Sequence, residues 1–335
     1  MRHGLARPST RGGCDVTSSI GERFAYFQGQ VVPLEEAKVS VMTHALNYGT
    51  GVFEGIRGYW NEEQEDIYIF RLRDHYVRFL KNCRMMFIEV PLDADQLCEL
   101  TIDLVRRHGY REDVYIRPLA YKSAEQIGVS MAGISDDLTI FVSPFGNYVD
   151  IDNGLSVCVS SWQRSSDNAI PARAKVTGNY ANSALIKNEA LLNGFDEGIV
   201  LNTMGNVVEG SAENIFLVRD GVLITPSVAD GILEGITRDC VMRLALDELG
   251  VPTVERAINR TELYYADEMF FSGTGAQVAP ITSVDRRPVG PGAIGPITAQ
   301  MQRLYFDVAK GRVPKYMDWL TSVNVTSRAG ALPAQ

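Results

Sequence analysis

The stretch PFGNYVDIDNG, residues 144–154, separates two halves of the chain that differ in their sequence patterns. It is dense in turn-forming residues, whereas strand and helix patterns stand on both sides of it. A chain of 335 residues is too long for one ordinary hydrophobic core, so we expect two domains. The sequence therefore predicts a small α/β domain over residues 23–145, a linker over 146–154 and a larger domain over 155–323.

In the first half, the pattern alternates between strands and helices. Tyr76, Phe79, Leu80 and Cys83 recur at positions i, i+3, i+4 and i+7, which is typical of one face of a helix. A second amphipathic helix over 97–108 is closed by Gly109. The expected strands are a hairpin at 24–27 and 31–32, followed by 66–70, 114–121 and 138–143.

In the second half, short strands separated by glycine-containing turns dominate. Helices are expected over 182–192, capped by Gly194, and over 237–249. The expected strands cover 155–161, the two parts of 199–209 on either side of Met204-Gly205, 214–218, 222–225 and 269–272. Strands and helices mixed in this order predict an α+β arrangement around a barrel-like sheet.

The charge and the cysteines exclude several classes of function. A net charge of -9 disfavours a nucleic-acid partner, whose phosphates the protein would repel. No apolar run approaches the roughly 20 residues that a membrane span needs. The five cysteines are scattered, which favours a reducing, cytoplasmic setting. The four histidines show no metal-binding spacing, so we expect no metal site.

The two ends of the chain, residues 1–22 and 324–335, have the composition of disordered tails. The first is basic and rich in Ser, Thr and Gly, which is also typical of an organelle transit peptide. It lacks an amphipathic apolar face and carries Asp15, so we favour the interpretation as a tail.

Lys175 stands in an unusual setting, the stretch RAKVTGNYANS. Asp167 is the one acidic residue within ten positions on either side, although surface lysines usually have acidic neighbours. An ordinary surface loop would explain the stretch, and so would a lysine held in a reactive site. The rest of the chain must decide between them.

Three further stretches have both a plain and a functional interpretation. LEGITRD, residues 233–239, opens a helix whose free N–H groups suit an anion, or Thr237 simply caps that helix. In VEGSAENIF, residues 208–216, Glu209 is either half of a salt bridge or the partner of a pyridinium nitrogen. SGTGA, residues 272–276, lacks the last glycine of a dinucleotide-binding motif; it is a glycine-rich turn or a loop suited to a small carboxylate.

The stretch HALNYGTGVFEGIR, residues 44–57, and the later YIRP, residues 115–118, combine small residues, aromatic residues and arginines. This composition suggests loops that form the wall of a pocket. A glycine-rich connection with aromatic residues in the core is the alternative.

Taken together and in this order, these segments resemble the fold-type IV, pyridoxal-phosphate-dependent aminotransferases, and most closely the bacterial branched-chain amino acid aminotransferases. The likeness extends from about Phe24 to Val323. The family signature is matched by Glu209, Asn214, Phe216, Thr225, Leu233, Gly235, Ile236 and Arg238. The resemblance implies a two-domain α/β fold with a pseudo-barrel in the larger domain. It also implies transamination of leucine, isoleucine and valine with 2-oxoglutarate or glutamate.

The resemblance assigns Lys175 to a Schiff base with the aldehyde of pyridoxal 5'-phosphate. That chemistry needs a lysine that is an amine near neutral pH, and burial without a carboxylate partner would lower its pKa. After imine exchange with the substrate, Lys175 would move the proton between the substrate's α-carbon and the cofactor's C4′.

Other cofactor contacts follow from the same likeness. Glu209 would keep the pyridine nitrogen protonated, and Tyr180 would bond to the ring oxygen. The phosphate would contact Arg78, the backbone of Ile236 and Thr237, and Thr274. Leu233 and Gly235 complete the set of expected cofactor-binding residues.

For the substrate, the resemblance implies a carboxylate site and an apolar pocket. The loop of Gly273, Thr274 and Gly275, with the Tyr115 hydroxyl, would receive the α-carboxylate. The side-chain pocket would be lined by Tyr48, Phe53, Phe145 and Tyr180. Arg57 and Arg117 would stand at its far side, where Arg117 helps to accept the second carboxylate of glutamate or 2-oxoglutarate.

Two departures from the better-known bacterial sequences bear on substrate range. Phe145 stands where they carry Trp, and Gly275 stands where they carry Ala, so both open the site slightly. D-amino acid aminotransferases, (R)-amine transaminases and an aminodeoxychorismate lyase share the fold and remain alternatives. A binding protein without activity is another. The YIRP and YGTGVFEGIR segments favour the branched-chain type, and the family implies a homodimer or a higher homo-oligomer.

Overall fold

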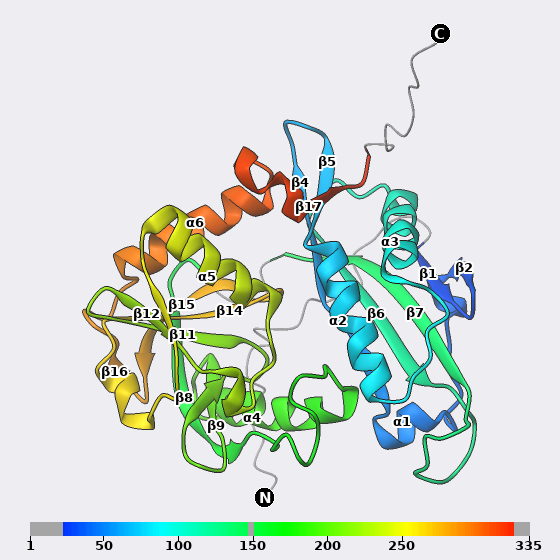
Figure 1. Ribbon diagram of the computed structural model, residues 1–335, viewed down its shortest axis with the longest axis horizontal. Helices are drawn as coiled ribbons and strands as arrows, with labels where there is room; N and C mark the ends of the chain where they lie inside the picture. Colours follow the sequence, from blue (N-terminus) through cyan, green and yellow to red (C-terminus); the bar gives the residue numbers. More distant parts are fainter. Residues whose placement is uncertain (1–22, 147–150, 325–335) are drawn as a thin grey trace, which may run out of the picture.

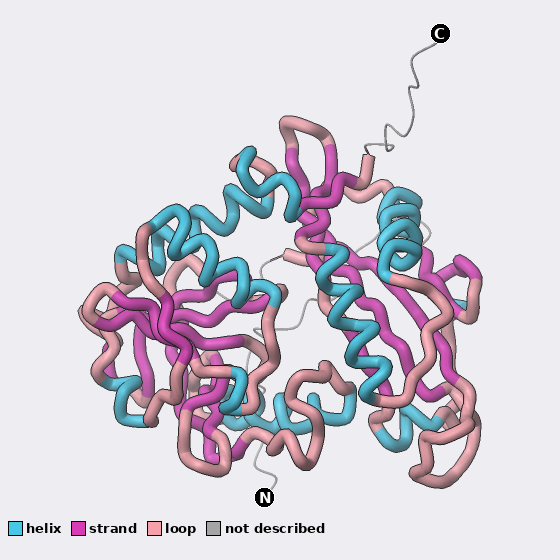
Figure 2. The backbone as a smooth tube through the Cα atoms, viewed as in Figure 1, coloured by secondary structure: helices cyan, strands magenta, loops and turns pink. Residues whose placement is uncertain are grey.

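The computed structural model describes residues 23–146 and 151–324, and its strands form two separate sheets, one from the first half of the chain with β17 (Leu320–Ser322) added, and one from the second half. Figures 1 and 2 show the two sheets side by side, each with helices against it. The expected tail at 1–22, residues 325–335 of the second tail and residues 147–150 of the expected linker lie outside the described residues. The division into domains therefore stays a prediction.

The first sheet is antiparallel throughout, in the order β17-β5-β4-β6-β7-β1-β2, with β3 paired to β6 beside this path. Its strands are β1 (Phe24–Phe27), β2 (Gln30–Pro33), β3 (Gly51–Phe53), β4 (Ile56–Asn61), β5 (Asp66–Phe70), β6 (Val114–Lys122), β7 (Asp136–Pro144) and β17 (Leu320–Ser322). The helices of this half are α1 (His44–Tyr48), α2 (Leu72–Met85) and α3 (Ala94–His108), with the 3-10 turn η1 (Leu34–Glu36).

Helices α2 and α3 cover one face of the first sheet (Figure 1). In α2 the expected apolar face forms, and Tyr76, Phe79 and Cys83 are buried in the core of this half. Helix α3 begins at a capping box in which Asp93 and Gln96 satisfy each other's backbone N–H groups. It ends at Gly109, whose left-handed backbone closes the helix as expected.

The second sheet curls into a ring, because β10 pairs both with β9 and with β11. The ring consists of β8, β9, β10, β11, β14 and β15, and β12, β13 and β16 extend it. The strands are β8 (Leu155–Gln163), β9 (Glu197–Leu201), β10 (Val207–Glu209), β11 (Asn214–Arg219), β12 (Val222–Thr225), β13 (Thr253–Glu255), β14 (Glu268–Gly273), β15 (Gln277–Val284) and β16 (Arg287–Pro288). This ring is the expected pseudo-barrel, with an apolar core of its own.

The helices of the second half lie outside this ring (Figure 1). They are α4 (Tyr180–Leu192), α5 (Ile236–Leu249) and α6 (Pro296–Ala309), with the 3-10 turns η2 (Thr177–Asn179), η3 (Val228–Asp230), η4 (Arg260–Tyr264) and η5 (Pro314–Trp319). No helix in residues 23–146 and 151–324 is long and apolar enough to cross a membrane.

Several contacts join the two halves. A buried aromatic cluster joins Tyr59 and Phe70 of the first sheet to Tyr305 of α6, and the two tyrosine hydroxyls are 3.1 Å apart. Strand β17 returns from the end of the chain to pair with β5. Strand β3 forms a single bridge, Val52 to Val176, with the segment that carries Lys175.

Several expected elements differ in the structure. Residues 44–57 are not a loop, because they form α1, β3 and the start of β4. Their glycines occur where space is short: a Cβ on Gly49 would stand 2.6 Å from the Cα of Gly178. Helix α4 begins at Tyr180 instead of residue 182, and α5 begins at Ile236 after Gly235. Strands β13, β15, β16 and β17 and helix α6 had no counterpart in the sequence-based expectation.

Candidate active site

A cavity of about 420 Å³ lies between the two halves and gathers most of the residues singled out in the sequence. Its lining includes Phe53, Arg78, Tyr115, Arg117, Phe145, Lys175, Tyr180, Leu233, Gly235, Ile236, Thr237, Gly273, Thr274 and Gly275. These residues come from β3, α2 and β6 on one side, and from α4, α5 and the β14–β15 turn on the other. A smaller recess joins Lys175 and Tyr180 to Glu209.

Hydrogen bonds fix both the backbone and the side chain of Lys175. Its carbonyl accepts a hydrogen bond from the Phe53 N–H at 3.1 Å, which ties it to β3. Its Nζ donates to the Tyr180 hydroxyl at 2.6 Å, because Tyr180 opens α4 only five residues later. The plain interpretation as a lysine on a surface loop is therefore wrong, since the side chain reaches into the cavity.

The expected lowering of the Lys175 pKa is contradicted. Burial lowers the pKa of this ammonium, but Tyr180 and the Glu54 carboxylate raise it, and the net direction is upward. No carboxylate lies close to Lys175 in sequence, yet the fold brings Glu54 near it from the turn between β3 and β4. The protein without a ligand therefore favours the charged form of Lys175.

Glu209 ends β10 on the other side of Lys175, and it does have an ion-pair partner. The Arg164 guanidinium lies 3.1 Å from its Oε1 and also donates to the carbonyl oxygens of Gly210 and Ser211. Burial raises the pKa of Glu209, while Arg164 and the Leu233 N–H hold it down. Arg164, at the end of β8, carries no motif that would have marked it in the sequence.

The first turn of α5 opens on the cavity without a side-chain cap. Gly235 is the N-cap residue, so the expected alternative of Thr237 as the cap is wrong. In the described part of the chain, the N–H groups of Ile236 and Thr237 have no acceptor. A Cβ on Gly235 would stand 2.0 Å from Oδ1 of Asn214, so only glycine fits this approach. Such a helix end attracts an anion.

Arg78 reaches the same end of the cavity from α2. Its Nε and Nη2 donate to the two oxygens of Glu54, each at 2.7 Å, and its Nη1 donates to the Glu234 carbonyl at 2.8 Å. His75, one turn earlier on α2, contacts Glu54 at 2.9 Å. Burial would raise the pKa of Glu54, but Arg78 and His75 hold it well below its usual range. Neither Glu54 nor His75 is among the site residues expected from the sequence.

The opposite end of the cavity is formed by the β14–β15 turn and β6. The Tyr115 hydroxyl accepts a hydrogen bond from Nη2 of Arg117 at 2.7 Å, and the Arg117 guanidinium stacks over Phe53 at 4.4 Å. The Tyr115 hydroxyl also explains why residue 55 is a glycine, because a Cβ on Gly55 would stand 2.3 Å from the hydroxyl oxygen. These groups offer donors and an apolar wall within one space.

Two of the expected substrate-binding residues do not line the cavity. Arg57 is buried behind it, where Nη2 donates to the carbonyl oxygens of Phe145 and Gly146 at 3.1 and 2.9 Å. It therefore holds the segment that carries Phe145. Tyr48 lies on α1 at the protein surface, and its hydroxyl accepts a hydrogen bond from the Gly128 N–H.

Glu213 is a lining residue whose place in the cavity the sequence did not suggest. Its buried carboxyl accepts from the Ala212 N–H at 3.0 Å. Burial, with Glu197 nearby, raises the pKa of Glu213 to about 8. Glu197 itself forms an ion pair with Lys187 at 2.8 Å. The positive charge of Lys187 therefore acts on both buried carboxyls, Glu197 and Glu213. Glu213 therefore favours its neutral form more than an exposed carboxyl does.

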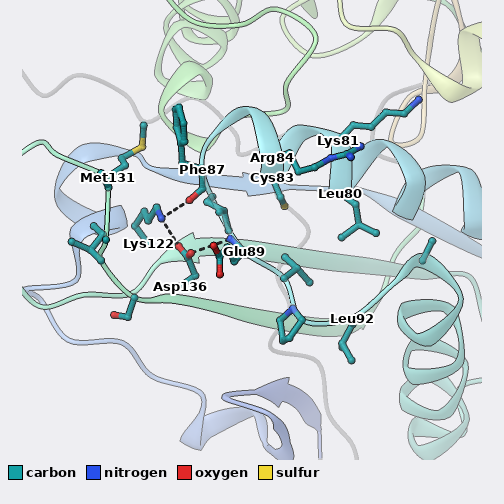
Figure 3. Close-up of a pocket in the computed structure, with 18 of the residues that line it drawn as sticks. Leu80, Lys81, Cys83, Arg84, Phe87, Glu89, Leu92, Lys122, Met131 and Asp136 are labelled. Atoms are coloured by element: carbon teal, nitrogen blue, oxygen red, sulfur yellow. Dashed lines mark hydrogen bonds and ion pairs between the residues drawn. The ribbon is translucent and has the colours of Figure 1, made fainter.

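A larger hollow, of about 1400 Å³, lies beside the end of α2 and contains none of the expected site residues. Within it Lys122 donates to the Phe87 carbonyl and pairs with Asp136 at 2.9 Å, and Asp136 accepts from the Glu89 N–H (Figure 3). These polar groups satisfy one another. The smaller cavity, with its unpaired helix end and its lysine, is the better candidate for chemistry.

Comparison with known proteins identifies the family of this chain. The family model described as amino-transferase class IV matches residues 51–284, which span most of the chain and carry both sides of the cavity. This chain belongs to the class IV aminotransferases.

The relatives of this class IV aminotransferase match nearly its whole length. A probable branched-chain-amino-acid aminotransferase of Aquifex aeolicus is 49% identical over 91% of this chain and 98% of its own. The branched-chain aminotransferase of Thermoproteus uzoniensis, solved with norvaline, has a TM-score of 0.87 at 46% identity and covers 90% of this chain and 100% of its own. That of Thermobaculum terrenum, solved in its PLP-form, has a TM-score of 0.87 at 41% identity, over 91% and 99% of the two chains.

The cavity of this class IV aminotransferase fits pyridoxal phosphate in its donor set. The α5 N-terminus and Arg78 provide donors for a phosphate at one side. Lys175 offers an amine, and Glu209 offers a buried carboxylate for a ring nitrogen. Phosphate donors, amine and carboxylate converge on one space, as this cofactor requires.

Proposed function

We propose that this chain transfers the amino group of branched-chain L-amino acids to 2-oxoglutarate, with pyridoxal 5'-phosphate as cofactor. The observation that carries the proposal is the convergence of Lys175, Tyr180, Glu209 and the open end of α5 on one cavity. The names of the relatives, all branched-chain aminotransferases, supply the substrate class.

The residues that would hold the cofactor divide by its chemical groups. Arg78, the N–H groups of Ile236 and Thr237, and Thr274 would bind the phosphate. Tyr180 would donate to the ring oxygen, and Glu209 would face the ring nitrogen. Lys175 would hold the aldehyde carbon covalently through Nζ. Leu233 and Gly235 line the same space and would pack against the ring and the phosphate side.

When bound, pyridoxal phosphate supplies an electron-withdrawing ring that makes the substrate's α-hydrogen acidic. Arg164 opposes the rise in the pKa of Glu209 that burial causes, and the Glu209 carboxylate would favour a proton on the ring nitrogen and so strengthen that withdrawal. Lys175, as a free amine, would take the proton from the substrate's α-carbon as a base. Tyr180, 2.6 Å from Nζ, orients Lys175 for this transfer.

Arg117 is proposed to recognise the second carboxylate of glutamate, while Phe53 and Phe145 receive the aliphatic side chain of leucine. We therefore expect Arg117→Ala to lower kcat/KM for glutamate at least tenfold more than for leucine, because only glutamate loses a charged partner. Steady-state kinetics with both donors measures this difference. Equal losses for glutamate and leucine would remove Arg117 from the recognition of the second carboxylate.

Absorbance spectra of the purified protein test the proposed function directly. Portions are mixed separately with L-leucine, D-alanine and (R)-1-phenylethylamine. We expect a visible band from the lysine-bound cofactor that fades to a near-ultraviolet band with L-leucine. A response only to D-alanine or to the amine would support the proposed cofactor but contradict the proposed branched-chain substrates. Release of pyruvate from aminodeoxychorismate without a 2-oxo acid would indicate the lyase, and no band with added cofactor would contradict the whole proposal.

We also propose that the chain forms a homodimer through an apolar surface patch made of Val41, Leu46, Ile127 and Val129, which are 63–81% exposed. The hydrogen bond from Nε2 of His44 to the Gly128 carbonyl, at 2.8 Å, joins the two segments into one surface. Single apolar side chains on a surface are common, but a contiguous group indicates an interface.

If this patch is the dimer contact, Leu46→Glu should shift the protein towards the monomer in analytical ultracentrifugation, because it places a charge in an apolar contact. Leu246→Glu is the matched control, since Leu246 is similarly exposed on α5. An unchanged assembly in Leu46→Glu would contradict the proposed contact.

The cytoplasmic location stays a prediction, and the free thiols of Cys83, Cys98, Cys158 and Cys240 are consistent with a reducing setting.

A further inference from the structure

Glu54 is a fully buried carboxylate beside the cavity, and the proposed mechanism does not use it. It lies in the turn between β3 and β4, and its own N–H donates to the Pro118 carbonyl at 3.0 Å. Burying an ionised carboxylate is costly unless it is paired and hydrogen-bonded. Here three donors from two side chains of α2 satisfy it.

The pairing fixes the plane of the Arg78 guanidinium. Nε and Nη2 donate to separate oxygens of Glu54, which is the bidentate geometry that orients an arginine most firmly. Nη1 donates to the Glu234 carbonyl, one residue before the N-cap of α5. A guanidinium has five N–H donors, so two remain for the cavity that Arg78 lines.

His75 completes the arrangement from the same face of α2. An ionised carboxylate can only accept, so Nδ1 of His75 carries the hydrogen that it donates to Oε2 of Glu54. Burial lowers the pKa of His75, although Glu54 opposes this, so the ring is neutral near pH 7. His75 therefore contributes a donor to Glu54 without adding a charge.

We propose that Glu54 and His75 are positioning residues for the cofactor phosphate, which hold Arg78 so that its two remaining N–H groups serve the cavity. The inference rests on the proposed function, because it takes pyridoxal phosphate as the ligand. The inference predicts the direction in which Glu54 changes the affinity for the phosphate. A carboxylate close to a phosphate weakens binding by charge alone, so a gain from Glu54 must come from the orientation of Arg78.

The test is the affinity of the cofactor-free full-length protein for pyridoxal phosphate and for pyridoxal, which lacks the phosphate, followed by tryptophan fluorescence. We expect Glu54→Gln to lower the affinity for pyridoxal phosphate at least tenfold and to change the affinity for pyridoxal less than twofold. In an Arg78→Met background, Glu54→Gln should have no further effect on pyridoxal phosphate. Glu268→Gln is the matched control, since Glu268 is a buried carboxylate of β14 that accepts from the N–H groups of Ile297 and Thr298 and does not line the cavity.

A second pair of variants keeps the test decisive if Glu54→Gln folds poorly. His75→Leu should lower the affinity for pyridoxal phosphate several-fold. His75→Asn keeps a donor near the position of Nδ1, so this variant should retain most of the affinity. Equal losses for both ligands, or tighter binding of pyridoxal phosphate in Glu54→Gln, would overturn the inference. A wild-type protein that binds neither ligand would overturn the proposed function and this inference with it.

Discussion

Lys175→Ala should abolish transamination, with a fall in turnover of about three orders of magnitude or more, because it removes both the covalent attachment and the proposed base. The visible band of the lysine-bound cofactor should vanish as well. Cofactor that is held only by Arg78 and the end of α5 should leave the protein on gel filtration. Turnover of leucine with 2-oxoglutarate, measured beside the absorbance spectrum, checks all three results.

The fold should survive this substitution, since Lys175 contributes one side-chain hydrogen bond and its neighbours remain. Circular dichroism and the thermal midpoint establish that the variant is folded. Lys315→Ala, which removes a surface lysine paired with Glu248, is the matched control and should keep wild-type turnover. Measurable transamination by folded Lys175→Ala would exclude Lys175 as the reactive lysine.

Glu209→Gln should leave cofactor binding largely intact but slow the removal of the α-hydrogen by about a hundredfold or more, roughly 3 kcal/mol of lost transition-state stabilisation. Glutamine keeps the shape of the side chain but not the charge that favours a protonated ring nitrogen. It also leaves Arg164 without its ion-pair partner. Single-turnover kinetics with α-deuterated and ordinary leucine measures this step and shows whether it limits the rate.

Glu262→Gln is the control for the loss of a carboxylate that is paired with an arginine. Glu262 is as little exposed as Glu209 and pairs with Arg256 far from the lining of the cavity. Its variant should have a wild-type rate. If Glu209→Gln also has a near-wild-type rate, the proposed role of Glu209 at the ring nitrogen is refuted.

The sequence predicted best those features that depend on nearby residues. The spacing of Tyr76, Phe79 and Cys83 located α2, since a helix repeats its contacts every three or four residues. Lys175 and Tyr180 belong to one short motif, and the fold brings their side chains together in the cavity. By contrast, β15 carries Pro280, which argues against a strand inside a sheet. It pairs with β14 from Gln277 to Ile281, and with β8 only from Ile281 onwards.

The partners of the charged site residues could not be predicted from the sequence. Glu54, His75 and Arg164 reach the site from elements that become neighbours only in the folded protein. The pKa of Lys175 was misjudged for the same reason, because Glu54 lies far from it along the chain. The glycines of residues 44–57 suggested a loop, yet the small size of Gly49 lets the end of α1 approach Gly178 closely.

The pairing of β17 with β5 has a consequence for how the protein is made. Leu320, Thr321 and Ser322 complete the edge of a sheet whose other strands are translated much earlier. These three residues are synthesised long after the other strands of that sheet, so the first half must wait with the polar edge of β5 uncovered. We expect a nascent chain that ends after α6 to need protection from aggregation, although every residue of the candidate site has by then been synthesised.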